Sequence, residues 1–419
     1  MNRLIPVLLM VAFLVLVLLP LSCVDSFEHK MNEQVNLVVI EGTITNLAEP
    51  QVIRLNRSKS DSLTGLFGTL PITGATVEII VDSAEVVLLK ETNAGRYQAP
   101  NGFAGKIGHA YQLRCTLREG TRYRSNHEVM AFVPPIRKVS AVFNPASLPA
   151  RLYNGTFNQY RGAHDLSVDW QDPADQHNYY RWEWSLWEKQ DWCHTCVQGF
   201  YVIYHPYDNT RLLEDCVSYT LNAENSTDSY FVNDYNCRTK CWEIIPSRDI
   251  NVFDDQLSNG GQIQGRRVAQ IPFYQYTGSL FELRQLSLSK QAYSYFKLFQ
   301  DQTQNSGGLA DTPPSAPVGN MRNEGNSQER VVGYFTASAV SSVRYWLDRK
   351  DATGLPIGLF EALNGLHPSP EGEIDPNTQK GKRSINNIYV SPINTNRVPR
   401  AVCVPSDSRT PVKPEGWRD

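Results

Sequence analysis

Five cysteines lie close together in the middle of the chain, and their spacing could support metal chemistry. They form two short pairs with a single cysteine between them: Cys193, Cys196, Cys216, Cys237 and Cys241. Two closely spaced thiol pairs resemble the ligand set of a tetrahedral zinc site, with His194 or His205 as alternative ligands. Cysteines of an exported protein oxidise, however, so we predict disulfides here and no metal. The spacing leaves the pairing open.

Two groups of acidic residues are further candidates for metal binding or for catalysis. Asp254 and Asp255 are adjacent, and Asp172 and Asp175 flank a turn that contains Pro173. Paired carboxylates can bind calcium or act as acid and base in hydrolysis. Turn formation is the simpler interpretation of the Asp172 segment, and neither group has the spacing of an EF-hand loop.

Sequence signatures of common enzymes are absent from the chain. It contains no Gly-x-Ser-x-Gly, no His-Glu-x-x-His and no glycine-rich phosphate loop ending in Lys-Ser or Lys-Thr. We therefore predict no catalytic residues and no cofactor. Because catalytic groups can also be assembled from distant parts of a chain, hydrolysis by Asp254 and Asp255 remains an alternative.

An aromatic segment supplies the candidate ligand-binding residues. Tyr179–Leu186 alternates, with apolar or aromatic residues at even positions and polar residues at 181, 183 and 185. This pattern predicts a half-buried strand whose aromatic side faces the core. Trp187 and Trp192 fall outside the alternation, and exposed aromatic rings can stack on sugars. We predict that these two tryptophans are the ligand-binding candidates.

The first residues have the pattern of an export signal. Arg3 precedes an apolar run, Leu4–Leu21, which is followed by the small Ser22 and then by Cys23. A charged start, an apolar middle and a small residue before a cysteine resemble a bacterial lipoprotein signal, so we predict cleavage after residue 22 and lipidation of Cys23. An uncleaved membrane-spanning helix is the alternative, since the run is just long enough to cross a bilayer.

Composition narrows the choice of partners. The chain has 40 basic and 43 acidic residues and a formal net charge of −3, so nucleic acid is not an expected partner. Of the 8 cysteines, an odd number follows Cys23, which leaves at least one thiol unpaired within the chain. Scattered glycine and proline indicate many short strands separated by turns.

The strand pattern predicts a mainly β protein with two domains. We expect an immunoglobulin-like β-sandwich over residues 33–134, where segments such as Thr76–Val81 alternate and glycines mark turns. Pro134-Pro135 indicates the boundary to a larger β-rich domain, residues 135–365, with long disulfide-prone insertions and a helix that begins near Ser287. Residues 23–32 form the lipidated tether, and residues 366–419 an extended C-terminal tail.

Short motifs occur in the same order and spacing as in a known family. They include Val39-Ile40-Glu41-Gly42, Thr73-Gly74-Ala75-Thr76-Val77, Gly95-Arg96-Tyr97, Asn178-Tyr179-Tyr180, Asp254-Asp255 and Gly333-Tyr334-Phe335. In these motifs the chain resembles a Bacteroidota outer-membrane lipoprotein family of unknown function, DUF4249. The family commonly carries a second cysteine three residues after Cys403, where this chain has Ser406. The resemblance therefore does not imply a disulfide within the tail.

The resemblance implies a location more than a chemistry. We expect a non-catalytic, lipid-anchored outer-membrane protein at the cell surface, serving as an accessory or ligand-binding subunit of a TonB-dependent receptor or another barrel complex. A surface hydrolase of glycans or peptides and a structural or adhesive surface protein are the alternatives. Asp25 and Glu28 are similar to the surface-export signals of this phylum. The alternative interpretation is that they are simply charged residues of a solvated tether. Asp61-Ser62-Leu63 and Asp82-Ser83-Ala84 resemble O-glycosylation motifs of this phylum.

Overall fold

The computed structural model describes residues 37–60, 67–149, 152–153, 156–157, 160–174, 176–197, 199–204, 213–218, 232–304, 318–364, 383–384 and 402–419. Contacts divide the chain into two compact units, and residues 37–57 and 71–419 form the larger one. Apart from strand segments within residues 58–70, the features below belong to this larger unit. The predicted signal peptide, Cys23 and the tether lie outside the described residues, and so do Asp61 and Asp175.

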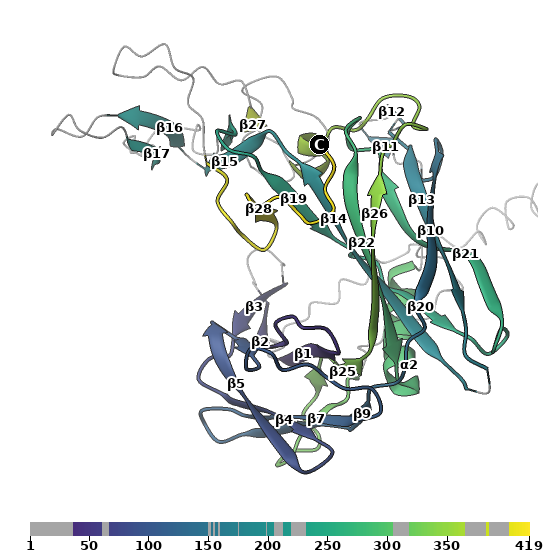
Figure 1. Cartoon of the computed structure of the whole chain (residues 1–419). Helices are drawn as coiled ribbons and strands as arrows, with labels where there is room; N and C mark the ends of the chain where they lie inside the picture. Colours follow the sequence, from purple (N-terminus) through teal and green to yellow (C-terminus); the bar gives the residue numbers. More distant parts are fainter. Residues whose placement is uncertain are drawn as a thin grey trace, which may run out of the picture. The chain divides into compact units, whose positions relative to one another are not determined.

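The N-terminal part of the larger unit forms a sheet whose strand order is β23-β8-β7-β4-β5-β6-β2-β1-β24. Figure 1 labels β1, β2, β4, β5 and β7 of this sheet. The bounds are β1 (Val38–Thr45), β2 (Val52–Ser60), β4 (Thr76–Val81), β5 (Glu85–Asn93), β6 (Arg96–Gln98), β7 (Ala110–Thr116), β8 (Arg122–Ser125) and β9 (Glu128–Val129). The last residues of β2 and nearly all of β3 (Phe67–Pro71) belong to the smaller unit. Alternation places Val38 and Ile40 of β1 in the core. The mainly β prediction is confirmed; the immunoglobulin-like arrangement stays a prediction.

Strands from much later in the chain complete this sheet. β23 (Met321–Asn323) pairs with β8, and β24 (Val331–Val332) pairs with the start of β1. β25 (Phe335–Ser338) runs parallel to β1, with Gly42 opposite Phe335 and Thr45 opposite Ser338. Parallel pairing needs a long connection, so the sequence of either partner alone does not predict it.

Most of the remaining chain forms two further sheets. One has the order β10-β13-β21, and the other has the order β26-β22-β14-β19-β28, with β20 also paired to β14. Their bounds are β10 (Ile136–Asn144), β13 (Ala163–Gln171), β14 (Tyr179–Lys189), β19 (Trp242–Pro246), β20 (Asn251–Asp254), β21 (Gln262–Pro272), β22 (Ser279–Leu288), β26 (Val340–Leu347) and β28 (Arg409–Thr410).

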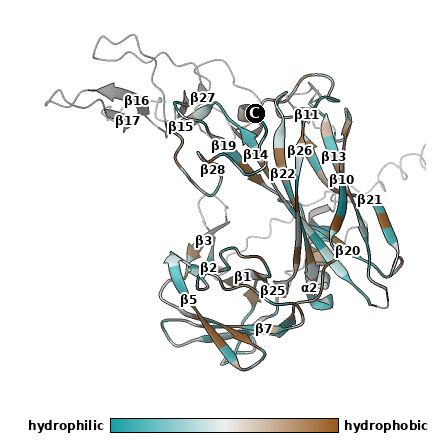
Figure 2. Ribbon diagram, in the orientation of Figure 1, coloured by the Kyte–Doolittle hydropathy of each residue, from teal (hydrophilic) through white to brown (hydrophobic). Residues whose placement is uncertain are grey.

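The aromatic segment is the central strand β14, and its predicted alternation is confirmed. Tyr180, Trp182 and Leu186 are fully buried, while Arg181 and Glu183 lie on the opposite, partly exposed side. β14 pairs with β22 along nine residue positions, from Tyr179 opposite Leu288 to Trp187 opposite Leu280. Figure 2 shows apolar and hydrophilic residues interspersed along the strands. One contiguous core cluster contains residues of both the N-terminal sheet and these later sheets.

The helix after β22 begins three residues later than predicted. α2 spans Lys290–Gln304, and the Ser289 hydroxyl caps it by accepting a hydrogen bond from the Ala292 backbone N–H at 3.1 Å. Ser287 instead lies in β22, where its hydroxyl donates to the Ala131 carbonyl at 2.8 Å. In the described residues, no helix is both long and apolar enough to cross a membrane.

The insertions and the end of the chain contain shorter elements. Their bounds are β11 (Leu152–Tyr153), β12 (Thr156–Phe157), β15 (Trp192–Val197), β16 (Gly199–Tyr204), β17 (Leu213–Ser218), β18 (Val232–Asn236), α3 (Leu359–Asn364) and β27 (Arg383–Ser384). Residues 402–419 differ from the predicted extended tail, because β28 pairs with β19 and Trp417 is buried. The Trp417 ring lies 5.8 Å from the Trp242 ring, centroid to centroid.

Candidate functional site

A cavity of about 560 Å³ lies where residues of β1, β2, β14, β22 and α2 come together. Its wall has a charged side, supplied by the strands and the loop after β1, and an aromatic side, supplied by α2 and Tyr334. All of the lining residues belong to the larger unit. Cavities of this size accommodate small ligands or short segments of larger ones.

Two arginine–glutamate pairs line the charged side, one between the neighbouring strands β1 and β2 and one along β14. Glu41 of β1 and Arg54 of β2 are opposite each other in the strand register, and their charged groups lie 3.8 Å apart. Arg181 and Glu183 are two residues apart on β14, which places both side chains on one face of the strand. Arg181 Nη2 lies 2.8 Å from Glu183 Oε1. The polar face of the aromatic strand therefore contributes to the cavity.

A third pair, Arg284 and Glu49, joins β22 to the loop after β1. Glu49 Oε1 also accepts a hydrogen bond from the Thr45 hydroxyl at 2.8 Å. Buried Gln51 accepts the Thr45 backbone N–H at 2.8 Å and donates to the Leu47 carbonyl at 3.1 Å. These bonds hold the loop against its strand, so the Glu49 carboxylate is fixed at the cavity wall.

The aromatic side comes mainly from one face of α2. Tyr295 packs on Phe299 with 5.1 Å between ring centroids and on Tyr334 with 4.8 Å. The Arg181 guanidinium lies 4.2 Å above the Phe296 ring, so a cation–π contact joins the two sides of the cavity. Burial raises the pKa of Tyr295 to about 12, which keeps its hydroxyl protonated at neutral pH.

Tyr334 is positioned from beneath the cavity. Its hydroxyl donates to Glu128 Oε1 at 2.9 Å, and Asn320 Nδ2 donates to the same oxygen at 3.2 Å. Burial raises the pKa of Glu128. The preceding Gly333 has a φ of 96°, and a Cβ there would lie 2.3 Å from the Ile40 carbonyl oxygen. Only glycine allows β1 and Tyr334 to approach this closely.

The cavity is suited to recognition of an amphipathic molecule. Three of its four arginines are each paired with a glutamate, so those six groups together carry no excess charge, and the fourth, Arg96, pairs with Asp407 at 3.0 Å. Arginine–carboxylate pairs offer both donors and acceptors to a polar ligand, and aromatic rings offer flat apolar surface. Sugars and peptide segments have both kinds of surface.

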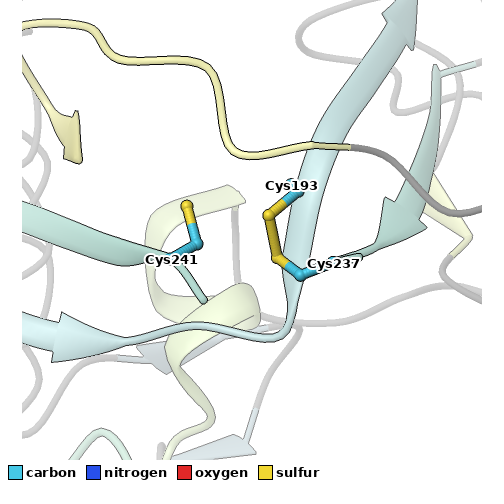
Figure 3. Close-up of side chains that lie close together, drawn as sticks. All are labelled: Cys193, Cys237 and Cys241. Atoms are coloured by element: carbon cyan, nitrogen blue, oxygen red, sulfur yellow. A yellow bond between two sulfur atoms is a disulfide. The ribbon is translucent and has the colours of Figure 1, made fainter. Parts of the chain in front are cut away.

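The structure joins two of the predicted cysteines to each other and a third to the tail. Cys193 and Cys237 form a disulfide with an S–S distance of 2.05 Å (Figure 3). Cys241 bonds to Cys403 over a separation of 162 residues. Three of these sulfur atoms, from Cys193, Cys237 and Cys241, lie within 4.8 Å of one another. As disulfides, they are not available as thiolate zinc ligands.

Three further cysteines lie on strands β7, β15 and β17. Cys196 lies on β15 and Cys216 on β17, but their side chains are outside the described residues, so the prediction of a disulfide there stays open. Cys115 on β7 is a buried free thiol. Burial raises its pKa, which makes it unreactive at neutral pH.

The two tryptophan candidates lie away from the cavity. Trp187 is half-buried and packs against the cluster of Trp242, Leu280 and Trp417, with the Arg344 guanidinium 5.9 Å from its ring centroid. Trp192 is buried against Leu359. Trp192 is therefore not the surface ring that its position outside the alternation suggested. A ligand-binding role for either residue stays a prediction.

Asp254 and Asp255 come together with a histidine that the sequence analysis did not single out. His177, just before β14, has its Nε2 atom 2.5 Å from Asp254 Oδ1 and 3.5 Å from Asp255 Oδ1. Asp172, at the end of β13, is beside them. Burial, and then the neighbouring Asp255 carboxylate, raise the pKa of Asp172. None of these residues lines the cavity described above.

Comparison with known proteins gives one match. Residues 24–344 match the model of a family described as Domain of unknown function (DUF4249). No curated protein and no solved structure matches the chain. The matched range includes every residue that lines the cavity, and it ends before Cys403.

Proposed function

This chain belongs to the DUF4249 family, and we propose that it is a non-catalytic binding protein, anchored in the outer membrane by a lipid on Cys23. The observation that carries the binding role is the cavity whose three arginine–glutamate pairs face an aromatic wall. Each of these cavity carboxylates is already engaged by an arginine, which suits recognition of a ligand better than proton transfer. A glycan or peptide segment has the matching chemistry.

The place of action is proposed from the sequence. A charged start, the apolar run Leu4–Leu21 and Cys23 support export and lipidation, and Asp25 with Glu28 support display at the cell surface. A TonB-dependent receptor or another barrel protein is the proposed partner. The tether would hold the protein in the plane of the membrane and so raise its effective concentration beside such a barrel.

Ligand binding is tested on the full chain with arrays of oligosaccharides and of peptides, followed by calorimetry on any hit. Phe296→Ala and Arg181→Ala remove the two partners of the cation–π contact, and each should weaken binding about tenfold or more. Arg124→Ala is the matched control, because Arg124 pairs with Glu324 at 3.2 Å with similar exposure but outside the cavity. Equal binding by all three variants would contradict the assignment of the cavity.

The anchor and the partner need separate experiments. Cys23→Ala should abolish incorporation of labelled fatty acid and release the protein from the membrane fraction. Affinity purification from solubilised outer membranes should recover a barrel protein with the wild type. Recovery of no barrel protein would count against the accessory role, and turnover of an array hit by the wild type would favour the hydrolase alternative.

A further inference from the structure

Four side chains from three separate segments converge at the end of β20, away from the binding cavity. Asp254 and Asp255 come from β20 and the residue after it, and His177 comes from the residues that lead into β14. One atom each of these three residues, a histidine nitrogen and two carboxylate oxygens, lies within 4.8 Å of the others. Asp172 is held beside them at the end of β13.

Asp255 carries the observation that points to a ligand. Its side chain is fully buried, and Oδ2 accepts hydrogen bonds from the Asn178 backbone N–H at 2.9 Å and from Asn178 Nδ2 at 3.1 Å. Oδ1 points towards His177 and has no hydrogen-bond partner in the part of the chain that the structure describes. A buried carboxylate oxygen without a partner is costly unless a cation balances it.

Asp254 and His177 are oriented as ligands would be. Asp254 Oδ1 accepts the Gln256 backbone N–H at 2.8 Å, which fixes the carboxylate. The His177 ring stacks on Tyr179 with 4.6 Å between centroids, and the Tyr179 hydroxyl lies 3.5 Å from Nδ1. Nε2 is thereby directed at both carboxylates. Outer contacts of this kind hold ligands in place around protein-bound metals.

Asp172 adds negative charge without being a ligand itself. Its Oδ1 accepts the Tyr180 hydroxyl at 2.7 Å, and its Oδ2 accepts the Gly260 backbone N–H at 3.1 Å. Each of its oxygens already accepts one hydrogen bond. With three carboxylates around a single imidazole, the cluster has a deficit of positive charge that a divalent ion would balance.

We propose that His177 Nε2, Asp254 Oδ1 and Asp255 Oδ1 form a binding site for a divalent first-row transition metal ion, such as Zn²⁺. Ligands each about 2.1 Å from a tetrahedral ion lie roughly 3.4 Å apart. The 3.5 Å from His177 Nε2 to Asp255 Oδ1 already fits this spacing. Binding of the ion would lengthen the 2.5 Å contact between His177 Nε2 and Asp254 Oδ1 by less than about 1 Å.

The ligand types distinguish this ion from calcium. An imidazole nitrogen suits zinc and its neighbours, whereas Ca²⁺ takes six to eight oxygen ligands. His177 is 44% exposed and Asp255 is 0% exposed, so the site has one open side for entry of the ion. Three protein ligands leave a fourth position for water or for a group from a partner molecule.

The test is calorimetric titration of the full chain in detergent with Zn²⁺, and separately with Ca²⁺, at neutral pH. We expect one saturable Zn²⁺ per chain, binding at least about tenfold more tightly than Ca²⁺, and a rise in melting temperature with Zn²⁺. His177→Ala and Asp255→Asn should each weaken Zn²⁺ binding about tenfold or more. Asparagine can still accept the Asn178 bonds through its amide oxygen, so the second variant is expected to fold.

The matched control is His109→Ala. His109 and Asp82 form another imidazole–carboxylate pair at 2.5 Å with similar exposure of the imidazole, but among the residues that the structure describes no second carboxylate joins them in a metal-binding group. This variant should bind Zn²⁺ like the wild type. Absence of saturable binding by the wild type, or unchanged binding by His177→Ala, would overturn the site. Ca²⁺ binding as tight as Zn²⁺ binding would overturn the choice of metal class. If Asp255→Asn does not fold, the His177→Ala result alone decides whether the site is correct.

Discussion

The Arg349 guanidinium and the Glu188 carboxylate form an ion pair in which both side chains are fully buried. Arg349 Nη1 donates to Glu188 Oε2 at 3.1 Å and also to the carbonyls of Gln275 and Thr277, at 3.1 and 2.9 Å. The pair therefore joins β14 to the end of β26 and to the turn before β22. A buried ion pair stabilises this arrangement only while both partners are present, because either charge alone would be buried without a partner and without water.

Glu188→Ala should destabilise the protein by about 3–5 kcal/mol, since it leaves the Arg349 charge buried and unpaired. Urea unfolding followed by tryptophan fluorescence measures this change. Lys350→Ala is the control, because Lys350 is 85% exposed in its pair with Asp348 and should change the free energy of unfolding by under about 1 kcal/mol. A Glu188→Ala variant as stable as the control would contradict the role given to the buried pair.

The bond between Cys241 and Cys403 fixes the end of the chain beside β19. Closing a loop of this length restricts the unfolded chain, so Cys403→Ser should lower the free energy of unfolding by about 2–5 kcal/mol. Peptide mapping without reductant should recover the Cys403 peptide linked to the Cys241 peptide. Cys115→Ser is the control for the map, because Cys115 is a free thiol and its change should leave the linked peptides as they were. A Cys403 peptide recovered with a free thiol would refute the pairing.

The elements of this fold differ in how far local sequence predicts them. The alternation at Tyr180 and Trp182 depends on neighbouring residues and correctly predicts a strand with a buried face. The partner of Cys403 depends on a contact made 162 residues away, which spacing alone does not encode. The buried Trp417 lies in a polar stretch, and its partners Trp242 and Trp346 both lie far earlier in the sequence.

The same distinction applies to the two candidate sites. Asp254 and Asp255 are adjacent and were recognisable as a pair, whereas His177 joins them only because β14 pairs with β20. The cavity combines Glu41 of β1 with residues of α2, and no local pattern marks that combination. The polar residues at alternate positions of β14, such as Arg181 and Glu183, indicated an exposed strand face in the sequence but not a cavity.

His164 should make stability depend on pH. Its side chain is 1% exposed and contacts Asp351 at 2.9 Å, and burial lowers its pKa below the ordinary value of 6.5. The unfolded chain then binds a proton more readily than the folded one, so stability is present above about pH 6.5 and is lost as the pH falls from there towards the lowered pKa. Lowering of the Asp351 pKa acts in the same direction at more acidic pH.

Measuring the free energy of unfolding between pH 7.5 and pH 5, both rough limits set by the ordinary histidine pKa, tests this expectation. His164→Gln removes the titrating group and should flatten the decline, while His127→Gln, at an exposed histidine, serves as the matched control. A His164→Gln variant whose stability declines as steeply as that of the wild type would show that other groups cause the pH dependence.

Gly333→Ala should damage both the sheet and the cavity. Alanine is disfavoured at a φ of 96°, and its Cβ would lie 2.3 Å from the Ile40 carbonyl oxygen, so β1 and the following Tyr334 would have to move apart. We expect a loss of about 2–4 kcal/mol in the free energy of unfolding, by adding backbone strain to a steric clash.

Gly102→Ala is the control for positive φ alone, because Gly102 has a φ of 85° but nothing within 4 Å of an added Cβ. If Gly333→Ala costs no more than Gly102→Ala, the close approach to Ile40 is not what requires glycine. If instead Gly333→Ala costs more and also weakens binding of an array hit, while Gly102→Ala leaves binding unchanged, the position of Tyr334 is part of the recognition surface.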